Sequence, residues 1–239
     1  MSTPLPDASR KRSRGRIGFI IIAVLTVAAV LYFLVAPAVQ RALLPGQLAA
    51  ASREAYAQAS ARIEADQDQA TAKLGAALRR EPAYSASYDI CYADHQDQGW
   101  VAVTYVYHCQ IASVTFFELT EHDSIRPRID SGDRYEHLFT GDYPEPVGKA
   151  VDDGDELFLA RDLPSDPHEA IDDTVLISDV VAYAVSDAFA DRRLIREAGV
   201  TGFDPERTYL VLTRNDNYFE EDLGCAYGGI LFCSSPLGE

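Results

Sequence analysis

The sequence lacks the local motifs by which many catalytic and phosphate-binding sites are identified. It contains no GxSxG nucleophile elbow, no SxxK, no GxxxxGK[ST] phosphate loop, no HExxH and no GxGxxG opening a helix after a strand. No CxxC pair is present, which argues against a structural zinc site. The 5 histidines are scattered singly, so none stands out as a ligand or base. These absences favour a non-catalytic protein and predict no cofactor.

Positive charge is scarce beyond residue 41. Residues 42–239 hold 15 basic and 36 acidic side chains, a net charge near −21. A surface this negative repels phosphate backbones, so nucleic acid is not expected as a partner. The chain has only 3 lysines and 2 asparagines beside many arginines and alanines, a usage that favours a bacterial gene of high GC content.

Charge is wholly absent from Ile17 to Ala36, a run of 20 residues. As a helix this run is about 30 Å long, the thickness of a bilayer's hydrocarbon core. Five basic residues precede it, and only Arg41 follows closely. The positive-inside rule therefore predicts a single-pass anchor with residues 1–16 as a cytoplasmic tail and the C-terminal part outside the cell membrane. The expected partner of residues 17–36 is the lipid bilayer.

A cleaved secretory signal is the competing interpretation of this run. Ala36-Pro37-Ala38 has the small-x-small pattern of a processing site, and cleavage there would leave Val39 as the new N-terminus. The 20 apolar residues exceed the 7–15 that are usual in a signal peptide, which favours an uncleaved anchor. Either alternative places the rest of the chain outside the cytoplasm.

Cysteines are few but even in number: Cys91, Cys109, Cys225 and Cys233. In an oxidising compartment an even count predicts disulfides, and four cysteines allow three pairings. We expect local pairing, Cys91 with Cys109 and Cys225 with Cys233, because each pair flanks a plausible hairpin.

Residues 37–81 are expected to form a helical stalk. They are rich in Ala, Gln, Glu and Arg, and no proline interrupts them between Pro45 and Pro82. One narrow apolar stripe runs along this helix, and Asp66 and Gln67 interrupt it. The stripe leaves two arrangements open, a solvated and weakly self-associating stalk or a helix packed on the domain that follows. The stripe consists of Tyr56, Ala59, Ile63, Ala70, Leu74, Ala77 and Leu78.

Residues 82–239 are predicted to form a small α+β domain. Alternation of apolar and polar residues predicts strands over 84–92 and 101–107, joined by a turn at 95–99, and a third strand over 111–119. We expect these three to form an antiparallel meander. Further strands are predicted at 155–160 and 208–213, and one main helix at 179–198 with Gly199 as its stop signal.

Two acid clusters could hold a cation, although neither matches a known calcium loop. Asp152, Asp153, Asp155 and Glu156 surround Gly154 and offer hard oxygen ligands. Asn215-Asp216-Asn217, followed by Glu220, Glu221 and Asp222, is the second candidate. In a chain with this many acids such runs are usually solvated loops, so no metal site is assigned and the first cluster is only a weak candidate.

Two classes of function remain. The first is a non-catalytic envelope protein, a binding, scaffold or assembly module with a possible envelope protein partner. The second is a membrane-tethered hydrolase acting on envelope carbohydrate or peptide, which would need two facing carboxylates or a histidine beside a serine or cysteine. The absence of catalytic motifs favours the first class, and the ligand and process stay unknown.

Overall fold

The computed structural model describes residues 19–28, 36–97, 103–120, 125, 134–139, 141–172 and 191–224. The chain divides into two compact units, and one of them is Ala50–Gly224. In the other unit, residues 19–28 are helical, with large apolar side chains exposed on all sides. Within the described residues, no helix combines the length and the apolarity needed to cross a membrane. Residues 17, 18 and 29–35 of the predicted span, and the tail 1–16, lie outside the described part.

Helix α2 (Ala36–Leu78) is the long helix of the chain, and its C-terminal part belongs to the Ala50–Gly224 unit. The helix ends in a Schellman motif: the Arg79 N–H donates to the Ala76 carbonyl and the Arg80 N–H to the Gly75 carbonyl. Arg79 has φ of 57°, a left-handed conformation in a position where glycine is usual. The Arg80 guanidinium donates to the Glu118 carbonyl, which ties the helix end to a strand.

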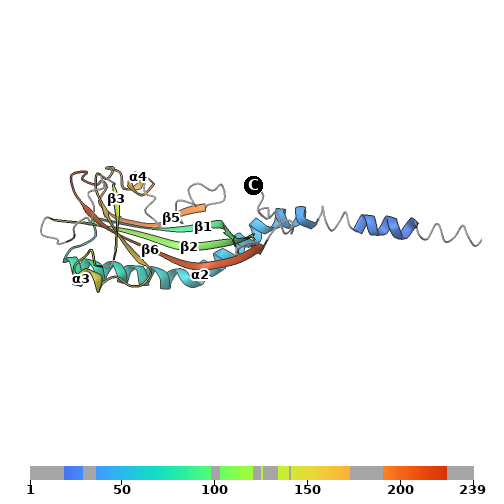
Figure 1. Cartoon of the computed structure of the whole chain (residues 1–239), viewed down its shortest axis with the longest axis horizontal. Helices are drawn as coiled ribbons and strands as arrows, with labels where there is room; N and C mark the ends of the chain where they lie inside the picture. The colour runs from blue at the N-terminus through green and yellow to red at the C-terminus, as the bar shows by residue number, and fades with distance from the viewer. Residues whose placement is uncertain are drawn as a thin grey trace, which may run out of the picture. The chain divides into compact units, whose positions relative to one another are not determined.

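A six-stranded antiparallel sheet forms the other layer of this unit (Figure 1). Its strands are β1 (Tyr84–Asp97), β2 (Val103–Glu118), β3 (Tyr135–Leu138), β4 (Asp155–Ala160), β5 (Asp191–Gly199) and β6 (Tyr209–Gly224), in the order β3-β4-β6-β2-β1-β5. Two short helices, α3 (Glu145–Gly148) and α4 (Pro167–Asp172), lie in the connections. The predicted α+β class and the antiparallel sheet are confirmed.

Both faces of the sheet carry a hydrophobic cluster. On the face that α2 covers, Ala70, Leu74 and Leu78 pack with Phe117 and Leu210, and Val147 of α3 joins them. On the other face, Ala112, Val114 and Phe116 of β2 pack with α4 and with Phe203. Successive side chains of β2 thus point to opposite faces of the sheet and contribute to two hydrophobic clusters. Of the two arrangements left open for residues 50–78, the structure has the helix packed on the sheet.

The predicted meander is wrong in its connections. β1 and β2 form the expected hairpin, but the predicted strands 101–107 and 111–119 are one strand, β2. No glycine or proline separates them, and Gln110 is buried like its apolar neighbours. The turn predicted at 95–99 is wrong in its first part, because β1 continues to Asp97, and residues 98 and 99 lie outside the described residues. The next neighbour of β2 is β6, from the end of the chain, and the predicted strand 208–213 extends to Gly224.

The main helix predicted over 179–198 is wrong in its last part. Residues 191–199 are strand β5, paired with β1, while 173–190 lie outside the described residues. Gly199 does end this element, but for a different reason: its φ is +120°, and a Cβ there would stand 2.2 Å from the Ala83 carbonyl oxygen. Glycine is therefore required where the end of β5 passes the start of β1. In the sequence, this glycine has the appearance of a helix C-terminal stop signal.

Candidate functional site

The contact between α2 and the sheet, which we call the seam, becomes polar toward the N-terminal side of the helix. Its apolar end is Ala70–Leu78, described above. Its polar end comprises Tyr56, Gln67 and Asp68 and the sheet residues that they contact. Gln67 is only 2% exposed, and its amide donates to the Ile111 carbonyl and to the Asp216 carboxylate, each at 3.1 Å. Asp68 accepts two bonds from the Arg196 guanidinium of β5.

A disulfide lies at this polar end. Cys91 of β1 and Cys109 of β2 stand directly opposite each other in the antiparallel register, and their sulfur atoms are bonded at 2.10 Å. The prediction of this pair is confirmed. Cys225 and Cys233 lie outside the described residues, so their pairing stays a prediction.

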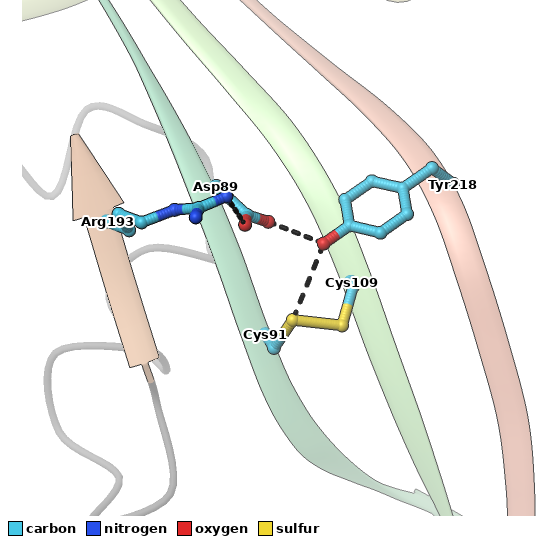
Figure 2. The surroundings of a disulfide bond; sticks show 5 residues. All are labelled: Asp89, Cys91, Cys109, Arg193 and Tyr218. Atoms are coloured by element: carbon cyan, nitrogen blue, oxygen red, sulfur yellow. Dashed lines mark hydrogen bonds and ion pairs between the residues drawn. A yellow bond between two sulfur atoms is a disulfide. The ribbon is translucent and has the colours of Figure 1, made fainter. Parts of the chain in front are cut away.

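Tyr218 connects the disulfide to a charged pair (Figure 2). Its hydroxyl donates to Asp89 Oδ1 at 2.5 Å and lies 3.7 Å from Cys91 Sγ. The other Asp89 oxygen accepts a bond of 2.9 Å from the Arg193 guanidinium. Burial, and then the hydrogen bond to Asp89, raise the pKa of Tyr218 above its usual value. The phenol therefore stays protonated and donates at neutral pH.

A β-bulge aims Tyr218 at this site. Cys109 pairs with Phe219 and Gln110 with Asn217, so Tyr218 is the extra residue of β6. Such bulges re-aim a side chain and occur often beside functional sites. Helix α2 closes the group, because the Tyr56 ring meets the Tyr218 ring edge-on at 5.6 Å and the Arg193 guanidinium lies 5.2 Å from the Tyr56 ring centre. We call Tyr56, Asp89, Cys91, Cys109, Arg193 and Tyr218 the Tyr218 cluster.

The first acid cluster is used for internal pairing. Asp152 accepts a bond of 2.6 Å from Lys73 of α2, which lowers the pKa of that carboxyl. The side chain of Asp155 is 1% exposed and pairs with Arg214 at 3.2 Å. Burial nevertheless raises the pKa of Asp155, more than Arg214 lowers it. Asp155 and Glu156 are successive residues of β4, so their side chains lie on opposite faces of the sheet. This geometry does not gather the four side chains around one point.

The second acid cluster is part of β6 rather than a loop. Asp216 receives bonds from Gln67 and Arg214, and Asp222 accepts a bond of 2.6 Å from Thr104. The Thr104 hydroxyl lowers the pKa of Asp222. Among the residues that the structure describes, no three His, Cys, Asp or Glu side chains are grouped closely enough to hold a metal ion.

Three histidine side chains have contacts within the described part of the chain. His108 lies 3.7 Å from Glu220 and stacks on Tyr92, and His168 lies 3.1 Å from Glu197. The His137 ring packs between the rings of Phe139 and Phe158. These contacts are with glutamates and aromatic rings.

Sequence reasoning named Tyr56, Cys91 and Cys109 but missed the other three residues of the Tyr218 cluster. Tyr218 and Asp89 are 129 residues apart, and Arg193 and Asp89 are 104 apart, so no local pattern joins them. Gln67 did leave a signal, since it interrupts the apolar helical stripe together with Asp66, and the structure buries Gln67 and exposes Asp66. Comparisons with known protein families, with curated proteins and with solved structures found no match.

Proposed function

We propose that this chain is a single-pass membrane protein that displays the Ala50–Gly224 unit outside the cytoplasm as a non-catalytic binding or assembly module. The apolar run 17–36 serves as the anchor, with the basic tail on the cytoplasmic side. The partner is an envelope protein rather than a nucleic acid, because the exported part is strongly acidic.

The observation that carries the location is the Cys91–Cys109 disulfide. Structural disulfides form and persist in oxidising compartments and are rare in the cytosol. The disulfide and the basic residues before the apolar run are independent features of the chain, and both support the same topology.

The geometry of the seam supports a binding or assembly role over a catalytic one. The charged side chains at the seam are engaged with one another across elements, as in Asp89–Arg193, Asp68–Arg196 and Asp155–Arg214. The first two pairs join β1 and α2 to β5, and the third joins β4 to β6. Side chains that hold a fold together in this way are not poised for proton transfer to a substrate.

The topology is tested with two reporters, each fused separately at the C-terminus of the chain. One reporter enzyme is active only after export, and the other fluoresces only in the cytoplasm. We expect activity from the first and none from the second. As a matched control, moving the basic residues of the tail to the other side of the apolar run should reverse both signals. Fluorescence from the unaltered chain would contradict the proposed location.

The partner is tested by cross-linking in intact cells. Photoreactive residues placed at exposed positions of the unit, such as Phe139 and Leu194, should give discrete adducts with an envelope protein. Gln67 and Leu74 are buried, and the same label there should give none. A unit that cross-links to nothing from any exposed position, or that hydrolyses envelope carbohydrate or peptide when purified, would contradict the binding role.

A further inference from the structure

The two sulfur atoms of the disulfide differ in their surroundings. Cys109 is fully buried, with 0% exposure, whereas Cys91 is half-buried. Cys91 Sγ is also the sulfur that lies beside the Tyr218 hydroxyl. Of the two cysteines, Cys91 is therefore the more accessible to an external thiol. A shift of its sulfur atom would change the contact with the Tyr218 hydroxyl.

Breaking the bond requires the sulfur atoms to separate. A disulfide holds them about 2.05 Å apart, whereas non-bonded heavy atoms stand about 3.5–4.0 Å apart. Close packing around the fully buried Cys109 leaves little room there, so the displacement falls on Cys91. Tyr218 Oη already lies 3.7 Å from Cys91 Sγ, and its bond to Asp89 is short. The displaced Cys91 thiol thus pushes against the Tyr218 hydroxyl and disturbs its hydrogen bond to Asp89.

The disturbance passes from Tyr218 to α2. The Tyr218 ring packs edge-on against Tyr56, and Arg193, the partner of Asp89, lies over the Tyr56 ring. The apolar end of the seam has a separate means of support, since Leu74 and Leu78 pack with Phe117 and Leu210 in the hydrophobic cluster. Loss of the Tyr218 contacts therefore affects the polar end of the seam and spares the apolar end.

We propose that the Cys91–Cys109 disulfide is a redox-sensitive clasp that fixes the polar end of the seam. As a disulfide it holds Tyr218 and Asp89 in the positions where the cluster docks Tyr56, at the start of residues 56–68 of α2. As two thiols it releases Tyr56. Residues 56–68 then open more readily from that side, against the contacts of Gln67 and Asp68, while Ala70–Leu78 stays docked on the sheet. The clasp goes beyond the proposed function, because it operates in the isolated protein whether or not a partner binds.

The reductant is a dithiol. One of its thiolates attacks Cys91 Sγ and forms a mixed disulfide, and Cys109 Sγ leaves as a thiolate that takes up a proton. The second thiolate of the reductant then displaces Cys91 Sγ, which is protonated in turn. The reductant gives up two electrons and two protons and becomes a cyclic disulfide, and the protein gains two thiols.

Hydrogen exchange measures the release segment by segment. The full chain is purified in detergent with Cys225→Ser and Cys233→Ser, so that only the Cys91–Cys109 bond responds to dithiothreitol. On reduction we expect exchange of the amides in residues 56–68 to rise about tenfold or more, as local opening becomes easier. Exchange in residues 70–78 should stay within about twofold of the oxidised protein.

Two variants separate the clasp from a general stabilising effect. Adding Cys91→Ser and Cys109→Ser to the same chain should give fast exchange in 56–68 that dithiothreitol no longer changes. Tyr218→Phe with the disulfide intact should also raise exchange in 56–68, because the bond to Asp89 is lost. If Tyr218→Phe leaves exchange slow, the route through Tyr218 is overturned.

Two results with the reduced protein overturn the clasp itself. Unchanged exchange in 56–68 after complete reduction would show that the disulfide does not hold this segment. An equal rise across 56–78 and the strands would show that the disulfide stabilises the whole unit without any local action. Both results are readable even if the double serine variant fails to fold.

Discussion

The two ends of the seam attach the same helix to the same sheet by different physical means. The apolar end relies on burial of Leu74 and Leu78, and each such side chain contributes about 1.5–3 kcal/mol without strong directionality. The polar end also buries Ile63, but otherwise it relies on hydrogen bonds and ion pairs, which are worth about 0.5–1.5 kcal/mol each and hold only in one geometry. The apolar end therefore supplies most of the affinity of the helix for the sheet, and the polar end supplies its register.

This division makes the polar end the natural place for a switch. Losing a directional pair frees one segment at low cost, whereas losing a buried leucine destabilises the unit as a whole. A single polar residue inside an apolar stripe fixes register in other packed helices as well. We expect Gln67, which is buried and bonded to Ile111 and Asp216, to have this role where the two ends of the seam meet.

The largest expected effect is at the apolar end. Leu74 is 1% exposed, so Leu74→Ala removes packed methyl groups and leaves a cavity. We expect the free energy of unfolding to fall by about 2–5 kcal/mol, measured by denaturant titration with circular dichroism. The control is Leu43→Ala on the same helix, where the leucine is 56% exposed and the change should stay within about 0.5 kcal/mol. A loss below about 1 kcal/mol at Leu74 would mean that the apolar end does not anchor the helix.

The junction of the two ends is tested by Gln67→Ala. The substitution removes the bonds to Ile111 and Asp216 at a buried site, and we expect a loss of about 1–3 kcal/mol. Gln69, two residues along and exposed, provides the control, because Gln69→Ala removes the same side chain from the solvated face. Equal losses of unfolding free energy for the two substitutions would show that the buried bonds of Gln67 do not stabilise the seam.

The apolar residues of this helix could be predicted from the sequence, and their polar neighbours could not. The predicted stripe included four residues that the structure buries, Ile63, Ala70, Leu74 and Leu78. It could be predicted because helical periodicity is a local property of the sequence. The same prediction counted Gln67 as an interruption of the stripe. Gln67 follows Ile63 by one helical turn and lies on the buried face, where its partners come from β2 and β6.

The order of the strands depended on contacts that no local pattern encodes. The β1–β2 hairpin could be predicted because the connection between its strands is short. In this hairpin Cys91 lies opposite Cys109. The insertion of β6 between β4 and β2 pairs β2 with a segment about a hundred residues later in the chain, which the sequence does not reveal. β5 resembled a helix because its arginines and Gly199 match the signals of a helix end. In the structure Arg193 pairs with Asp89 of β1, and Arg196 pairs with Asp68 of α2.

The polar end should respond to alkaline pH through Tyr218. Its folded-state pKa lies above the ordinary value of 10.0 because of burial and the bond to Asp89. A raised pKa means that its contribution to stability is fully present below pH 10 and is lost as pH rises further. Tyr218→Phe should cost about 1–2 kcal/mol at neutral pH and should make the alkaline decline of the unfolding free energy shallower.

The remaining alkaline sensitivity has other sources that serve as controls. Burial also raises the pKa of Tyr84 and of Tyr135, which lie away from the seam. Tyr135→Phe should therefore reduce the alkaline decline without changing hydrogen exchange in residues 56–68. A Tyr218→Phe variant with an unaltered pH profile would mean that the phenol is not held in the folded state as the cluster requires.

The smallest expected effect is at the exposed margin of the polar end. Asp68 and Arg196 form a bidentate pair, with bonds of 2.5 and 3.0 Å, but both side chains are largely solvated. Exposed ion pairs contribute about 0–1 kcal/mol, so Asp68→Asn should lower the free energy of unfolding by less than about 1 kcal/mol. The loss should shrink further in about 1 M salt, where the screening length falls to about 3 Å. Asp66→Asn changes the same charge on the same helical turn and should have no effect beyond about 0.5 kcal/mol. A loss above about 2 kcal/mol that persists in high salt would show that the ion pair, rather than Gln67 and Tyr218, holds the polar end.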